Sequence, residues 1–125
     1  MNYLVDADTI FDFFNGATEL FSLFDEVENI YVSAVTQGKL FYKAAQTESE
    51  KNLVQISRDF CHLLHIVQID EAIAMEYAKL KAEYPGFEEN KLWLSATAIT
   101  KDLVLVSRDE DFLKIKNIVV KNFFK

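Results

Sequence analysis

Short apolar segments alternate along the chain with longer segments in which hydrophobic residues recur every three or four positions. The apolar segments are rich in β-branched and aromatic residues, which favours buried strands. We expect strands at residues 3–5, 29–35, 64–69, 103–107 and 117–121. Because helical segments separate most of these strands, the pattern predicts an α/β domain of three layers, in which helices flank a mainly parallel sheet of about five short strands.

The helical segments begin after the strands, at polar residues suited to capping a helix. Asp8 or Thr9 is expected to cap the first helix. Thr36 is expected to cap the helix after the second strand, and Asp70 the helix after the third strand. We expect helices over residues 9–14, 18–24, 36–62, 70–84 and 88–100, with a break in the third near residues 46–48, a restart over 47–50, and a short helical turn at 108–112.

Composition limits the size and setting of the protein. The 125 residues, 50% of them hydrophobic with only 3 Gly and 1 Pro, suit one folded domain over residues 1–125 with a single core. The lone Cys61 excludes an intramolecular disulfide and is expected to be a small buried residue in a reducing compartment. No leader pattern or spanning apolar segment stands out, so a cytoplasmic protein without membrane contact is expected.

The formal net charge of −7 is the opposite of the basic footprint of a protein that binds nucleic acid nonspecifically. RNA binding would therefore require a local basic patch. An acidic surface also suits a basic protein partner or a cation site.

Charged and polar residues follow the predicted strands. The carboxyl ends of parallel strands meet at one edge of a sheet, so these side chains are expected to lie close together. The residues in question are Asp6, Asp8, Thr36, Lys39, Lys91, Asp109 and Asp111.

Four segments, residues 3–9, 32–40, 89–98 and 105–112, resemble in order and spacing the four motifs of PIN domains, the nuclease fold of VapC-like toxins. The resemblance implies that Asp6 is a metal-binding acid after the first strand, with Asp8 at a position where Asn or Ser is common. It implies a supporting role for Thr36. It also implies that Asp109 is the acid of the fourth motif and that Asp111 belongs to the end of that motif.

Two positions depart from this family pattern. Lys39 stands where the family has a catalytic Glu, and Lys91 stands where it has an Asp. The formal charges of Asp6, Lys39, Lys91 and Asp109 therefore cancel. A charged lysine has no lone pair to offer a metal, and it repels a divalent ion.

The resemblance therefore leads to two hypotheses. In the first, the protein has a degenerate site with no cofactor bound at normal affinity, the two lysines form ion pairs with the acids, and the protein acts by binding protein or RNA. In the second, it is an active endoribonuclease toxin that uses Mg²⁺ or Mn²⁺ held by Asp6, Asp8, Asp109 and Asp111, with Glu89 as a further source of oxygen ligands. Under either hypothesis the resemblance implies a homodimer and an antitoxin protein as partners.

Several of these residues also have ordinary structural interpretations. Asp8 and Asp111 are equally suited to capping helices. Lys39 and Lys91 also have an alternative interpretation as solvated helix residues, which requires the acidic cleft to be open. His62 and His65 are expected to be structural or exposed, because no carboxylate pattern near them suggests a metal site.

Overall fold

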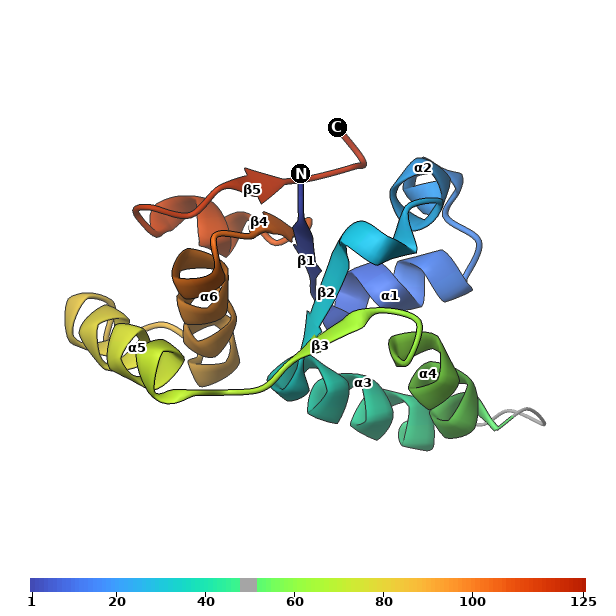
Figure 1. Cartoon of the computed structure of the whole chain (residues 1–125), viewed down its shortest axis with the longest axis horizontal. Helices are drawn as coiled ribbons and strands as arrows, with labels where there is room; N and C mark the ends of the chain where they lie inside the picture. Colours follow the sequence, from blue (N-terminus) through green and yellow to red (C-terminus); the bar gives the residue numbers. More distant parts are fainter. Residues whose placement is uncertain (48–51) are drawn as a thin grey trace.

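The computed structural model describes residues 1–47 and 52–125, and its centre is a sheet of five parallel strands in the order β3-β2-β1-β4-β5 (Figure 1). The strands are β1 (Tyr3–Val5), β2 (Ile30–Ser33), β3 (His65–Val67), β4 (Val104–Val106) and β5 (Val120–Lys121). The longest has four residues. The predicted α/β sheet of five short strands is confirmed.

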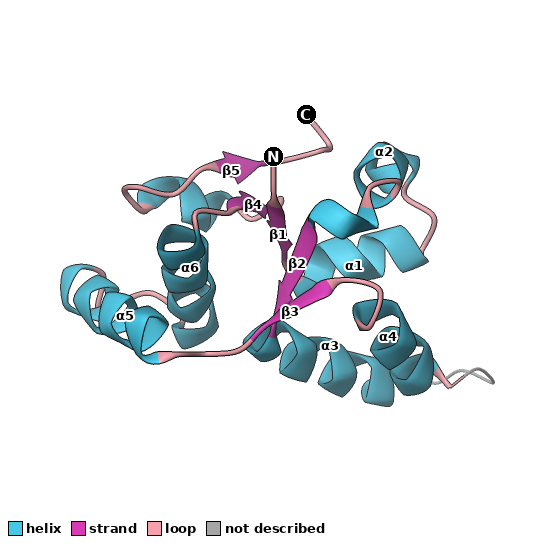
Figure 2. Cartoon of the chain, in the orientation of Figure 1, coloured by secondary structure: helices cyan, strands magenta, loops and turns pink. Residues whose placement is uncertain are grey.

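Helices cover both faces of the sheet, which gives the predicted three layers (Figure 2). One face carries α1 (Ala7–Phe14), α2 (Phe21–Phe24), α3 (Ala34–Gln46) and α4 (Leu53–Cys61), and the other carries α5 (Glu71–Glu83) and α6 (Glu89–Lys101). Short 3-10 helices lie at η1 (Thr18–Leu20), η2 (Val27–Asn29) and η3 (Glu110–Lys114). Within the described residues, no helix has both the length and the apolar character needed to cross a membrane.

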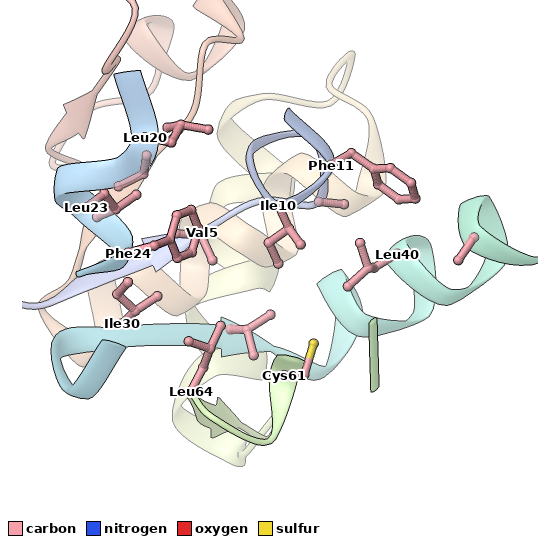
Figure 3. Packing of buried hydrophobic residues seen from close by; sticks show 14 residues of the cluster. Val5, Ile10, Phe11, Leu20, Leu23, Phe24, Ile30, Leu40, Cys61 and Leu64 are labelled. Atoms are coloured by element: carbon pink, nitrogen blue, oxygen red, sulfur yellow. The ribbon is translucent and has the colours of Figure 1, made fainter. Parts of the chain in front are cut away.

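The central strand β1 divides the core in two, because neighbouring side chains on a strand point to opposite faces. Leu4 packs with α6 and β4 on one side. Val5 packs on the other side with residues such as Ile10 of α1 and Leu40 of α3 (Figure 3). All four side chains are fully buried. Cys61 is also fully buried, which confirms the prediction that it is a small buried residue.

The helix caps differ from the sequence prediction at two places. Asp6 caps α1, because its Oδ1 accepts a hydrogen bond of 2.8 Å from the backbone nitrogen of Thr9. Ser33 caps α3 through a hydrogen bond of 3.1 Å from Val35. The predictions of Asp8 or Thr9 and of Thr36 as caps are wrong. In both cases the chain turns from strand into helix with no intervening loop, so the first polar residue after the apolar segment becomes the cap.

Other boundaries follow the prediction more closely. Asp70 caps α5, as predicted, through a hydrogen bond of 2.9 Å from Ile73. The helix α4 begins at Leu53 behind the cap Asn52. The restart predicted over residues 47–50 falls almost entirely in residues 48–51, outside the described part of the chain.

Candidate functional site

The sheet brings most of the predicted site residues into one pocket at the carboxyl ends of the strands. Asp6 follows β1, Asp109 follows β4, Thr36 and Lys39 come from α3, and Lys91 comes from the start of α6. These five residues and Asp8 line the pocket, together with Asn90 and apolar side chains. Asp111 is not among its lining residues but contacts Lys91 from η3.

Asp6 is held from two sides. Its Oδ1 caps α1, and its Oδ2 accepts a hydrogen bond of 2.6 Å from the hydroxyl of Ser107. Burial raises the pKa of the Asp6 carboxyl, and this effect outweighs the hydrogen bonds from Ser107 and Thr9, which lower it. Asp6 is therefore a fixed carboxylate whose ionised form is less stable in the fold than in water.

Ser107 is a site residue that the sequence reasoning missed. It is buried directly after β4, and its Oγ also accepts a hydrogen bond of 3.1 Å from the backbone nitrogen of Asp109. The Ser107 side chain thus links Asp6, after β1, to the backbone of Asp109, after β4. A polar residue at the end of a buried strand is the signal that points to it.

Lys91 reaches from α6 to two acids after β4. Its Nζ lies 3.0 Å from Oδ2 of Asp109 and 2.7 Å from Oδ2 of Asp111, and its side chain is 21% exposed. The hydrogen bond to Asp111 raises the pKa of Lys91 most, and the hydrogen bond to Asp109 raises it further. Lys91 and Lys114, whose Nζ lies 3.2 Å from Oδ1 of Asp111, hold the pKa of the Asp111 carboxyl below its usual value. The ammonium group of Lys91 is therefore charged and shared between two carboxylates.

Asp109 uses both of its carboxylate oxygens. Oδ1 accepts a hydrogen bond of 3.0 Å from the backbone nitrogen of Asp111 and so caps η3, while Oδ2 pairs with Lys91. Asp111 is therefore not the cap of this turn, an interpretation that the sequence left open.

Lys39 and Asp8 also line the pocket, but they lie outside the ion pairs of Lys91 with Asp109 and Asp111. Lys39 is exposed and forms no ion pair within the part of the chain that the structure describes, so the prediction that both lysines pair with the acids is wrong for Lys39. Asp8 lies 3.4 Å from Nζ of Lys43 on α3, a partner that the sequence reasoning missed.

Glu89 does not supply an oxygen ligand to the pocket. Its carboxylate accepts a hydrogen bond from Tyr77, and it lies 2.9 Å from Nζ of Lys81. Both partners are on α5, so Glu89 faces the neighbouring helix. The expectation that it compensates for the replaced acids is wrong.

The side chains of this centre do not fit a divalent metal ion. Across residues 1–47 and 52–125, no group of three or more His, Cys, Asp or Glu side chains is arranged to hold one. Mg²⁺ requires oxygen ligands around a single point. Here an ammonium group lies against Asp109 and Asp111, and the oxygens of Asp6 are engaged by Thr9 and Ser107.

The fold places the chain in a class of three-layer α/β domains that recurs in solved structures. A chain of DNA-bound VapBC from Salmonella typhimurium is similar with a TM-score of 0.88 and 17% identity over 98% of both chains. A chain of VapBC2 from Rickettsia felis, bound to a promoter DNA fragment, has a TM-score of 0.82 and 21% identity over 98% of both chains. A chain of a toxin-antitoxin complex from Klebsiella pneumoniae has a TM-score of 0.78 and 24% identity over 94% of this chain and 96% of that one.

The model of the PIN domain family matches residues 3–118, and the chain belongs to this family. The resemblance read from the four sequence motifs is confirmed. No curated protein is similar enough in sequence to count as a relative of this chain.

Proposed function

We propose that this chain is a VapC-like PIN-domain protein that acts by binding a protein partner, as the toxin-like half of a toxin-antitoxin pair, and not by metal-dependent cleavage of RNA. The observation that carries the proposal is the position of Lys91, with its ammonium group against Asp109 and Asp111. A PIN nuclease needs those oxygens for Mg²⁺ or Mn²⁺, and a charged lysine in their midst both occupies them and repels the ion.

The partner is supported by the similar structures. The chains from Salmonella typhimurium and Rickettsia felis belong to VapBC assemblies, and the chain from Klebsiella pneumoniae belongs to a toxin-antitoxin complex. This chain covers nearly the full length of each of these chains. It therefore offers the same fold as a docking surface for a comparable partner. We propose a small antitoxin protein as that partner.

The charge distribution supports a basic partner. Residues 1–38 contain seven Asp and Glu and no Lys or Arg, so this part of the chain accounts for the whole net charge of −7. Asp8 and Asp12 pair with Lys43 and Arg108. The acids around α2, among them Glu19, Asp25 and Glu28, form no ion pair within the described residues.

Apolar side chains lie within this acidic region. Phe13, Phe21 and Phe24 line a hollow together with Asp25, and Phe21 is 50% exposed. We call these four residues the acidic aromatic surface. It suits a segment that combines a bulky apolar side chain with neighbouring Lys or Arg, because burial of the ring and charge complementarity then act together.

Co-expression with the product of any small reading frame adjacent to the gene tests the partner. A complex that survives size-exclusion chromatography is expected, and Phe21→Ser should weaken it about tenfold or more. Tyr42→Ser is the matched control, because Tyr42 is a 66% exposed aromatic residue on α3 outside this surface. The partner assignment fails if the two proteins do not associate, or if both variants weaken the complex equally.

An RNA cleavage assay with highly purified protein tests the other half of the proposal. No cleavage is expected with Mg²⁺ or Mn²⁺. Metal-dependent cleavage that Asp6→Ala abolishes would instead establish the active endoribonuclease.

The mass of the free protein in solution, measured by light scattering, tests the further expectation of a homodimer.

A further inference from the structure

Lys91 ties two distant segments of the chain together across the site. It lies near the start of α6, and its two partners belong to the turn η3 after β4, so the contacts join residues 18 and 20 positions apart in the sequence. Asp109 caps η3 and Asp111 lies within it. The lysine therefore provides the positive charge that holds these two carboxylates beside α6.

The two lysines at acid positions of the family pattern are not equivalent. Lys91 is 21% exposed and contacts two carboxylates at 3.0 and 2.7 Å. Lys39 also lines the pocket, but it is exposed and has no ion pair among residues 1–47 and 52–125. Of these two lysines, it is thus Lys91 that lies where a cation would have to share the oxygens of Asp109 and Asp111.

We propose that position 91 alone decides whether this centre holds a divalent cation. The Lys91 ammonium is a built-in counter-cation for Asp109 and Asp111, and a carboxylate at the same position creates a site of three acids that binds Mn²⁺. This inference rests on the proposed function, because it assumes that the protein with Lys91 holds no metal at the centre.

Charge and geometry both support this assignment. Two carboxylates that converge within 3.0 Å of one ammonium nitrogen present their oxygens toward a common point. Oxygen ligands lie at about 2.0–2.1 Å from the centre of a small divalent ion such as Mg²⁺, so only small side-chain shifts separate the two arrangements. Replacing Lys91 by an acid changes the local charge by two units and leaves three carboxylates that repel one another, with Lys114, 3.2 Å from Oδ1 of Asp111, as their remaining ion-pair partner among the described residues.

The test compares Lys91→Asp and Lys91→Glu, which differ by one methylene, with two controls. Lys91→Met removes the ammonium without adding an oxygen, and Lys39→Glu restores an acid at the other replaced position. Mn²⁺ binding is measured by isothermal titration calorimetry and by electron paramagnetic resonance, and thermal unfolding is followed with and without Mn²⁺. Circular dichroism checks the fold of each variant.

At least one of the two Lys91 acid variants is expected to bind Mn²⁺ about tenfold or more tightly than the wild-type protein, with a midpoint of unfolding that rises on addition of Mn²⁺. Lys91→Met and Lys39→Glu should bind Mn²⁺ no more tightly than the wild-type protein, and their midpoints of unfolding should not rise on addition of Mn²⁺. If the acid variants fold only in the presence of Mn²⁺, the proposal is supported, because the cation then replaces the missing ammonium group.

Three results would overturn the proposal. The first is that both folded acid variants bind Mn²⁺ no better than the wild-type protein. The second is that Lys39→Glu alone creates equal binding, and the third is that the acid variants fail to fold with and without Mn²⁺. Because none of these measurements involves RNA or the protein partner, their failure is distinguishable from failure of the proposed function.

Discussion

Replacing Asp6 by Asn is expected to stabilise the fold at neutral pH. Burial raises the pKa of this carboxyl despite hydrogen bonds from Ser107 and Thr9. A carboxyl whose pKa is higher in the folded than in the unfolded state stabilises the fold while it is protonated. That contribution is complete below the unfolded pKa, near 3.8, and is lost as the pH rises through the folded pKa. At a pH well above the unfolded pKa, burial of the Asp6 carboxyl therefore opposes folding.

The structure sets the size of the effect. Asn retains an oxygen for the backbone nitrogen of Thr9, and it is among the best residues for capping a helix, so the cap of α1 is kept. The amide nitrogen of Asn would then lie where Oδ2 of Asp6 accepts from Ser107, and it would donate a hydrogen bond to the Ser107 hydroxyl oxygen. We expect a gain of up to about 1 kcal/mol, the net scale of one hydrogen bond. Asp6→Ala removes both contacts and should lose about 1–2 kcal/mol.

Urea unfolding of the wild-type protein, Asp6→Asn and Asp6→Ala at about pH 4 and about pH 7 measures these differences. The advantage of Asp6→Asn should grow toward pH 7, because the amide does not titrate. An advantage that is independent of pH, or an Asp6→Asn variant less stable than the wild-type protein at pH 7, would refute the reasoning.

The two lysines are expected to respond differently to removal of their charge. Lys91→Met should lower the free energy of unfolding at pH 7, because Asp109 and Asp111 lose their shared counter-ion. Lys91 holds the pKa of Asp111 below its unfolded value, so this contribution is present above the unfolded pKa and is lost as the pH falls through the folded pKa. The difference from the wild-type protein should therefore shrink in acid, and an unchanged difference in acid would contradict this account. Lys39→Met should leave the free energy of unfolding unchanged, because Lys39 is exposed and forms no ion pair within the described residues. A loss equal to that of Lys91→Met, measured in the same urea series, would show that both lysines serve the acids.

Much of the sheet could be predicted from the sequence, because β1 and β4 are apolar segments bounded by polar residues. The length of the edge strand β5 was less predictable. Residues 117–121 have strand composition, yet only Val120–Lys121 form β5, since Asn117 adopts a positive φ of 70° and β5 pairs with β4 alone. A strand with one neighbour has fewer hydrogen bonds to extend it.

The convergence of the site residues was also predictable, whereas the directions of their side chains were not. Thr36, Leu40 and Ala44 form the buried stripe of α3, and Lys39 lies beside that stripe. Sequence spacing alone does not decide whether a long side chain at such a border turns inward or toward solvent. The capture of Asp109 and Asp111 by Lys91 depends on where α6 begins relative to η3, which is a property of the packed fold.

A titration of the wild-type protein with Mn²⁺, followed by calorimetry at physiological salt, tests the central claim most directly. With the Lys91 ammonium against Asp109 and Asp111, we expect no binding tighter than about millimolar. Binding of Mn²⁺ in the micromolar range that Asp6→Ala abolishes would contradict the claim.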